Sequence, residues 1–121
     1  KLFCDAGIIT ICSFVSPYRE DRETARNLVD ESEFIEVYVS CPIEVCIQRD
    51  PKSMYSKAIA GKMKAFTGVD DPYEVPDLPE ITIETDRLTL AESVEKIIGY
   101  LHSKGFLETL KYNCCTDAIG Q

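Results

Sequence analysis

The strongest constraint on the fold is an alternation of short β-branched runs with amphipathic stretches. Gly7 is followed by the run 8–12, Ile-Ile-Thr-Ile-Cys. Its lack of polar alternation predicts a parallel strand that is covered on both faces. The run 34–39 predicts a second strand, and the shorter run 81–84 predicts a third.

Helices are predicted between and after these strands. The segment beginning at Pro17 has acidic first turns and apolar residues at three- and four-residue spacing, and the segments 43–47 and 90–101 have apolar residues on one face. The order βα, βα, β, α predicts an α/β fold with a parallel sheet and right-handed crossovers. In such folds ligands bind beyond the carboxyl ends of the strands, so functional residues should follow the strands.

The charge and the apolar content exclude several classes of function. A formal net charge of -8 opposes nonspecific binding to nucleic acid or to an anionic membrane, because both surfaces repel an acidic protein. The longest apolar runs are far shorter than the roughly 20 residues of a membrane helix, so neither a transmembrane nor a signal segment is predicted. An anionic ligand would need a local basic pocket.

The six cysteines predict thiols rather than a disulfide scaffold. Cys12, Cys41 and Cys46 fall within or beside apolar runs, which favours reduced and mostly buried side chains. Cys114 and Cys115 are adjacent but lack a second cysteine pair or a nearby histidine, so no metal site is predicted. Reduced thiols favour an intracellular, cytoplasmic setting.

Residues 51–79 contain a group of four lysines, at 52, 57, 62 and 64, which makes the first half of this stretch basic in an acidic chain, and they show little hydrophobic periodicity. One interpretation is a solvated connection between elements, and the other is a mobile lid that covers an anion. Within it, the segment 64–74 combines Phe66, a glycine turn and flanking charge. That combination suits stacking on a base, or a turn anchored by Phe66.

The segment 13–18 directly follows the first predicted strand. Ser16 is placed to cap the helix that Pro17 begins, which would leave backbone N–H groups free for an anion. Capping alone is the commoner explanation of such a serine.

Three segments taken together resemble the adenylyl-sulfate (APS) kinases: SFVSPYREDRETAR, CPIEVCIQRDPKSMY and AGKMKAFTGVDDPYEVP. The resemblance spans roughly residues 2–101, and FTGVDDPYE is its most discriminating part. It implies a P-loop kinase-like three-layer fold and the carboxy-terminal two-thirds of such a kinase, including the kinase domain of bifunctional PAPS synthases. Residues 1–107 would be a partial kinase domain, with 51–79 as lid and substrate loop, and 108–121 a peripheral tail.

The resemblance also implies a reaction. Family members transfer the γ-phosphoryl group of ATP, accompanied by magnesium, to the 3′-hydroxyl of adenosine 5′-phosphosulfate (APS), which gives PAPS for sulfate activation. It further implies a homodimer and an ATP sulfurylase domain or partner as expectations. The alternative is a catalytically inactive sulfonucleotide-binding or regulatory module.

Site residues carried over by this resemblance lie on the APS side. The five positions are Val15, Ser16, Lys52, Ala65 and Phe66. Phe66 would stack on the adenine and Lys52 would supply charge, whereas Ser16 also matches a serine that carries phosphate in some family members. Arg49 matches an arginine near the ATP adenine, and a helix-end salt bridge with Asp50 is the equally weighted alternative.

The sequence departs from the family pattern on the ATP side. It contains no GxxxxGK[ST] phosphate-binding loop, and by resemblance that amino-terminal unit and its central strand should precede Lys1. We therefore expect a fragment with exposed sheet edges and apolar surface, which is not a stable, active monomer. Ala65 stands where the family usually has glycine, which would cost free energy only at a positive φ.

Overall fold

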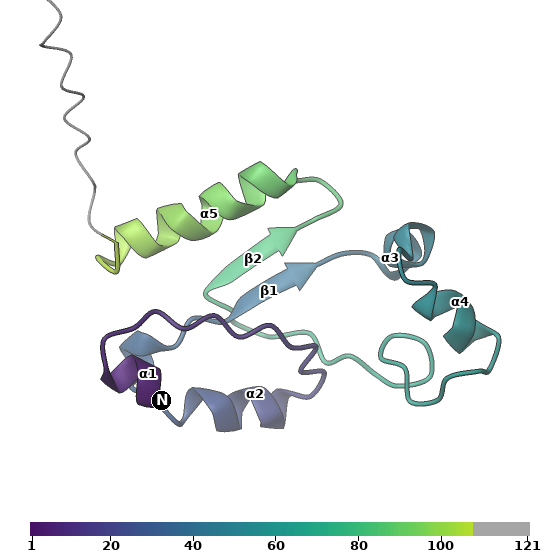
Figure 1. Ribbon diagram of the computed structural model, residues 1–121, viewed down its shortest axis with the longest axis horizontal. Coiled ribbons are helices and arrows are strands. Elements are labelled where there is room, and N and C mark those ends of the chain that lie inside the picture. Colours follow the sequence, from purple (N-terminus) through teal and green to yellow (C-terminus); the bar gives the residue numbers. More distant parts are fainter. Residues whose placement is uncertain (108–121) are drawn as a thin grey trace, which may run out of the picture.

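The structure, a computed structural model, describes residues 1–107 and is built around a two-stranded parallel sheet (Figure 1). Strand β1 spans Val37–Ser40 and strand β2 spans Ile81–Glu84. They pair in register from Val37 opposite Ile81 to Ser40 opposite Glu84. This confirms two of the predicted strands and their parallel arrangement, although β1 begins three residues later than predicted.

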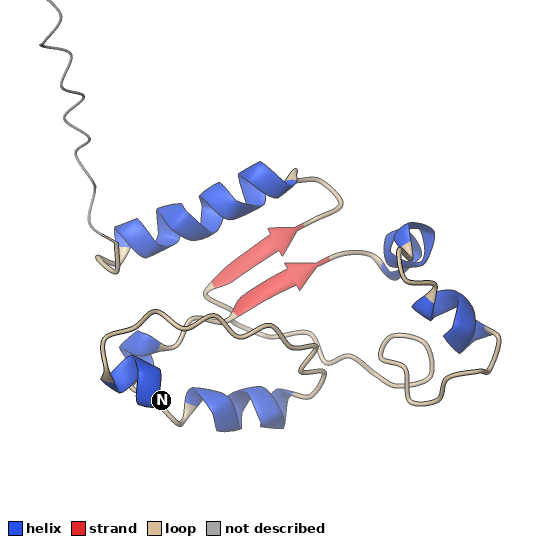
Figure 2. Ribbon diagram, in the orientation of Figure 1, coloured by secondary structure: helices blue, strands red, loops and turns tan. Residues whose placement is uncertain are grey.

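Over residues 1–107, five α-helices and one short 3₁₀ helix surround the strands (Figure 2). They are α1 Leu2–Asp5, α2 Arg19–Arg26, the 3₁₀ helix Glu31–Glu33, α3 Ile43–Arg49, α4 Met54–Ile59 and α5 Leu90–Ser103. Helices α2, α3 and α5 confirm the three predicted ones. Helix α4 lies inside the basic stretch and was not predicted, because its sequence has little periodicity.

Helix α5 packs on β2 and covers one side of the small core. The buried apolar residues of the described chain are Ile81 and Ile83 on β2 and Ala58 on α4. Ser93 of α5 is also buried, and its hydroxyl donates a 2.7 Å hydrogen bond to the Thr89 carbonyl. The hydroxyl is therefore satisfied inside the helix, and its burial costs little.

The predicted strand at residues 8–12 is wrong. This segment is extended without strand pairing, and its apolar side chains are exposed, Ile11 to 90%. A β-branched run forms a strand only where a neighbouring strand receives its N–H and C=O groups. Cys12, predicted buried, is likewise exposed, whereas Cys41 and Cys46 are half-buried.

The sheet leaves apolar surface uncovered, as expected. In the described chain β1 pairs only with β2, so its other edge carries no ladder, and Val39 in β1 is 61% exposed. Cysteines 4, 12, 41 and 46 are free thiols. No helix within residues 1–107 has the length and apolar character to cross a bilayer. The predicted peripheral tail, 108–121, lies outside the described residues.

Candidate functional site

The first and third segments that carry the family resemblance lie against each other. The Tyr18 hydroxyl donates to both oxygens of the Asp71 carboxylate, at 2.9 and 3.1 Å. The Glu74 N–H donates to the Pro17 carbonyl at 2.8 Å. Residues more than 50 positions apart in the sequence therefore form one wall, in which the loop before α2 meets the loop after α4 (Figure 1).

Arg22 ties this wall to the sheet. Its guanidinium donates 2.6 Å hydrogen bonds to the carbonyls of Ser16 and Glu74, and its Nε lies 3.0 Å from Glu36 Oε1. Its side chain is only 11% exposed. Because one rigid group holds three chain segments, Arg22 fixes the path of the loop that contains Ser16. Sequence reasoning missed this residue, since a helix arginine in a charged stretch usually faces solvent.

A second arginine, Arg26, forms a partly buried ion network with two glutamates. Its guanidinium lies 2.6 Å from Glu80 and 3.2 Å from Glu36, and the Glu80 carboxylate also accepts the Glu36 N–H at 2.6 Å. Burial opposes ionisation of Glu80, but the hydrogen bonds from Arg26 and the Glu36 backbone prevail and lower its pKa. The hydrogen bond with Glu80 raises the pKa of Arg26, although burial opposes it. Both groups are charged at neutral pH.

Ser16 does not cap the helix, so that prediction is wrong. Helix α2 begins at Arg19, its N-cap is Tyr18, and no side chain of the cap residue bonds to it. The Arg19 N–H instead donates to the Glu74 carboxylate at 2.7 Å. Ser16 has φ 41°, a left-handed conformation in which its carbonyl reaches Arg22. A cap from a residue 55 positions away could not be found in local sequence.

The loop around Phe66 is closed by the Asp70 carboxylate. That carboxylate accepts the N–H groups of Phe66 at 2.6 Å and Ala65 at 2.9 Å, and these bonds lower the pKa of Asp70. Ala65 has φ 53°, which confirms that glycine would suit this position better. Gly68, at φ 84°, approaches so closely that an added Cβ would lie 3.1 Å from Ile43 Cδ1. The loop is therefore a compact turn rather than an extended connection.

Phe66 faces a cavity of about 630 Å³ at the carboxyl end of β1. Its ring meets Tyr55 edge to face, with centroids 5.0 Å apart and an interplanar angle of 77°. The cavity is lined by residues of the loop before α2, of β1, of α3 and α4, and of the Phe66 loop: Phe14, Val15, Val37, Tyr38, Val39, Cys41, Ile43, Cys46, Tyr55, Ala65, Phe66, Thr67, Gly68 and Tyr73. An aromatic, mostly apolar wall of this kind suits a planar base.

The predicted site residues divide into two groups. Val15, Ala65 and Phe66 line the large cavity, and Val15 with Ser16 lines an adjoining cavity of about 410 Å³. Lys52 is exposed in the turn between α3 and α4 and lines neither cavity. Sequence reasoning missed Tyr38, Tyr55 and Tyr73, whose only signal was their position after or between predicted elements.

Arg49 does not form the salt bridge with Asp50 that was one of its two predicted roles. Its Nη2 donates to the Thr85 carbonyl at 2.8 Å, and its Nη1 lies 3.9 Å from Cys41 Sγ. The salt bridge with Asp50 is wrong, because the Asp50 carboxylate instead accepts N–H groups at the start of α4, from Met54 at 2.7 Å and Tyr55 at 3.1 Å. Arg49 thus connects the end of α3 to the residue after β2.

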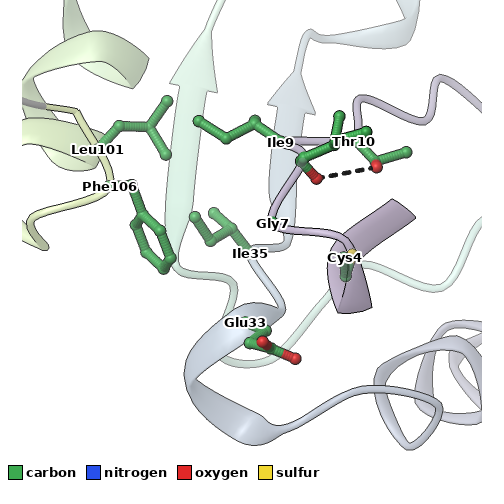
Figure 3. A pocket seen from close by; sticks show the side chains of 9 residues that line it. Cys4, Gly7, Ile9, Thr10, Glu33, Ile35, Leu101 and Phe106 are labelled. Atoms are coloured by element: carbon green, nitrogen blue, oxygen red, sulfur yellow. Dashed lines mark hydrogen bonds between the residues drawn. The ribbon is translucent and has the colours of Figure 1, made fainter. Parts of the chain in front are cut away.

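A smaller cavity of about 270 Å³ lies apart from these residues (Figure 3). Ile9 and Thr10 of the amino-terminal segment face Leu101 and Phe106 across it, with Ile35 between them. The Thr10 hydroxyl donates to the Ile8 carbonyl at 3.3 Å. None of the predicted site residues lines it, and its walls are mainly apolar, so it is a gap in packing rather than a site for an anion.

The residues present do not fit a magnesium–ATP centre. The 121-residue sequence has no GxxxxGK[ST] loop to hold the β- and γ-phosphates. Over the part of the chain that the structure describes, no group of three or more His, Cys, Asp or Glu side chains is placed to hold a metal ion. What the described residues do form is an aromatic, mostly apolar cavity beside Phe66.

The chain has a parallel α/β sheet with a cavity at the carboxyl end of a strand, and it shares the P-loop kinase fold of the solved structures that resemble it. Residues 1–84 match the family described as Adenylylsulphate kinase, so the chain belongs to the adenylylsulphate kinase family. The sequence resemblance to this family and the expected fold are thereby confirmed.

Curated proteins that resemble this chain in sequence are named as members of the same family. A probable adenylyl-sulfate kinase of Halalkalibacterium halodurans is 54% identical over 104 residues, which are 86% of this chain and 52% of that protein. An adenylyl-sulfate kinase of Clostridium acetobutylicum is 57% identical over 101 residues, 84% of this chain and 50% of that protein. The chain thus spans about half the length of the curated relatives it matches.

A solved structure, the Mycobacterium tuberculosis APS kinase CysC in complex with AMPPNP and APS, superposes with a TM-score of 0.75 at 35% identity. The match covers 84% of this chain and 59% of that one.

Proposed function

We propose that this chain is the APS-binding part of an adenylyl-sulfate kinase, which transfers the γ-phosphoryl group of ATP to the 3′-hydroxyl of APS and forms PAPS. The observation that carries the proposal is the joining of the two most characteristic segments around one cavity. Tyr18 and Pro17 of the first segment form hydrogen bonds with Asp71 and Glu74 of the third segment. Val15 and Phe66 line the cavity beside them. The relative solved with APS supports the same ligand.

Phe66 is the proposed adenine platform. Its ring is held edge-on by Tyr55, and its loop is held by Asp70, so little side-chain freedom remains to be lost on binding. Stacking of a base on an aromatic ring contributes about 1 to 3 kcal/mol. Ala65 would cover the same base from the loop backbone.

The charged groups of APS need partners outside the apolar wall. Val15 and Ser16 contribute the loop that adjoins the cavity, and Arg22 holds that loop in place through the Ser16 carbonyl. Lys52 lies outside the lining, so its proposed contact with the nucleotide requires movement of the turn between α3 and α4. That movement would give residues 51–79 the lid function proposed from their basic composition. Ser16 is proposed as a binding residue first and as a phosphate carrier second.

The remaining expectations concern the complete protein. Arg49 is proposed to approach the ATP adenine, with ATP and magnesium bound by residues that this sequence does not contain. A homodimer, fusion to an ATP sulfurylase as in bifunctional PAPS synthases, and an intracellular, cytoplasmic setting are proposed from the family. The free cysteines support the last of these.

A titration with APS tests the proposed cavity. Calorimetry with the chain should detect APS binding, and Phe66→Ala should weaken that binding about 5- to 150-fold, the equivalent of about 1 to 3 kcal/mol. Phe3→Ala is the matched control, since Phe3 is 62% exposed on α1 and lines none of the three cavities. In the complete enzyme the same Phe66 variant should raise KM for APS much more than KM for ATP.

Equal effects of the two phenylalanine substitutions would contradict the role of Phe66. Absence of APS binding by a chain that circular dichroism shows to be folded would contradict the cavity assignment itself.

The lack of a phosphate-binding loop favours a second function, a catalytically inactive module that binds the sulfonucleotide and senses it. The two proposals agree on APS binding and differ in turnover. The complete natural gene product should convert APS and ATP to PAPS under the first proposal. Under the second it should bind APS with no ATP-dependent turnover, and its reading frame upstream of Lys1 should encode no GxxxxGK[ST] loop.

A further inference from the structure

Two thiols line the large cavity and have no part in the proposed function. Cys41 directly follows β1, and Cys46 lies in α3, so both face the space that Tyr55 and Phe66 enclose. Both are half-buried and free. They are the only cysteines among the residues that line this cavity.

The start of α3 brings the two side chains together. Pro42 is the N-cap, so Cys41 stands one position before the cap and Cys46 at the fourth position of the helix. Side chains at these two positions pack on one another at helix starts. The Cys46 N–H donates to the Pro42 carbonyl at 3.1 Å, which fixes the turn between them. The Cys46 thiol interacts with Cys41 and with Tyr55.

Cys41 lies beside a basic group and is open to the cavity. Arg49 Nη1 lies 3.9 Å from its sulfur, and the side chain is reachable from the cavity. Reactive cysteines in proteins are partly exposed and lie close to basic groups. Cys46 lies in the same wall, together with Tyr55.

We infer that Cys41 and Cys46 form a redox-active dithiol site that takes disulfide oxidants of the glutathione class. Cys41, as the thiolate, attacks one sulfur of oxidised glutathione, which forms a mixed disulfide and releases one glutathione thiolate. The Cys46 thiolate then attacks the Cys41 sulfur, and the second glutathione leaves. Two protein thiols lose two electrons and two protons, and one oxidised glutathione becomes two reduced ones.

The order of the two steps follows from the environment. Burial raises the pKa of the Cys46 thiol, and its interaction with Cys41 acts in the same direction. A partly buried thiol with a raised pKa is a slow nucleophile toward a reagent in solution. It remains effective toward a sulfur that is already adjacent, because proximity replaces a bimolecular encounter. Cys41 is therefore the attacking residue and Cys46 the resolving one.

Tyr55 connects the two cysteines to Phe66, the proposed adenine platform. Tyr55 touches the Cys46 thiol on one side and the Phe66 ring on the other. A Cys41–Cys46 disulfide removes the thiol that Tyr55 contacts, so the position of the Phe66 platform should depend on the redox state. This part of the inference rests on the proposed function, and it predicts different APS affinities for the reduced and oxidised chains.

Peptide masses test the dithiol site. The chain, with Cys114→Ser and Cys115→Ser to prevent exchange with those thiols, is equilibrated in mixtures of reduced and oxidised glutathione, alkylated and digested with trypsin. The peptide 27–49 contains Cys41 and Cys46 as its only cysteines, and the peptide 2–19 contains Cys4 and Cys12. The first should lose two hydrogen atoms without alkylation, whereas the second should carry glutathione or alkyl groups on separate thiols.

Two controls show whether the bridge depends on the folded structure or only on the short separation of the two cysteines in the sequence. Cys41→Ser and Cys46→Ser should each leave a glutathione mixed disulfide on the remaining thiol. The native chain should form the bridge at an oxidised-to-reduced glutathione ratio about tenfold lower than the chain in guanidinium chloride. Equal ratios in native and denaturing buffer, or a native peptide 27–49 with two glutathiones, would overturn the inference.

Titration with APS then tests the connection to the cavity. Equal affinities of the reduced and bridged chains would overturn the coupling through Tyr55. Absence of APS binding in both states would contradict the proposed function, while the peptide masses would still decide the dithiol site.

Discussion

Ala65 holds a backbone conformation that an alanine adopts only at a cost. Its φ of 53° lies in the left-handed region, where a Cβ costs about 1 to 2 kcal/mol, while glycine is free of that clash but loses more chain entropy on folding. We expect Ala65→Gly to stabilise the chain by about 0.5 to 1 kcal/mol in urea unfolding. Ala60→Gly is the matched control, since Ala60 at the end of α4 has φ −74° and should lose stability. Loss of stability in both variants would contradict the argument.

The Asp70 carboxylate gives the Phe66 loop a dependence on pH. Because the N–H groups of Phe66 and Ala65 lower its pKa in the folded chain, the stabilisation is present above its ordinary value of 3.8 and is lost as pH falls through the lower, folded value. Asp70→Asn should therefore reduce the urea midpoint at pH 7, and the difference from the parent chain should shrink below about pH 4. Asp30→Asn is a control, because Asp30 makes no side-chain capping hydrogen bond. A difference that is constant with pH would refute this linkage.

Among the elements, α5 is the helix whose first turn is closed by a capping box. The Thr89 hydroxyl accepts the Glu92 N–H at 3.3 Å, and the Glu92 carboxylate accepts the Thr89 N–H at 2.8 Å. This capping box satisfies helix N–H groups that would otherwise lack partners. Thr89→Ala should reduce the free energy of unfolding by about 1 kcal/mol, measured by urea denaturation. Thr24→Ala on the exposed face of α2 should change it by less than half as much, and an equal loss would contradict the capping role.

The elements also show what local sequence can and cannot predict. Strand β2 and helix α5 were predicted because the β-branched run and the helical spacing of apolar residues can be recognised in adjacent residues. The strand at 8–12 was wrong because strand formation depends on a partner, which local propensity does not contain. Val15 and Phe66 were predicted as APS contacts from the family segments, and the structure places both in the wall of one cavity. Arg22 and the cap from Glu74 were missed because their partners lie tens of residues away.

At the scale of the whole molecule, ion pairs and hydrogen bonds connect segments that the small apolar core does not reach. Only three apolar residues are buried in the described chain, whereas Arg22 and Arg26 join α2, the segment before β1 and the loop before β2 through Glu36 and Glu80. Ion pairs of this partly buried kind fix the arrangement of segments more than they add stability. The Phe66 cavity therefore has a defined wall in a chain with little buried apolar area.

The uncovered edge of β1 should make the chain associate with itself. An unpaired strand edge with an exposed apolar residue is a site for strand addition, and Val39 in β1 is 61% exposed. Sedimentation velocity of the parent chain should show a sedimentation coefficient that rises with concentration. Val39→Lys should reduce this rise, because a charge on an edge strand opposes pairing. Leu78→Lys removes an equally apolar residue that is 88% exposed in a loop, and it should leave association unchanged. If both lysine variants reduced association equally, general surface hydrophobicity rather than the β1 edge would be responsible.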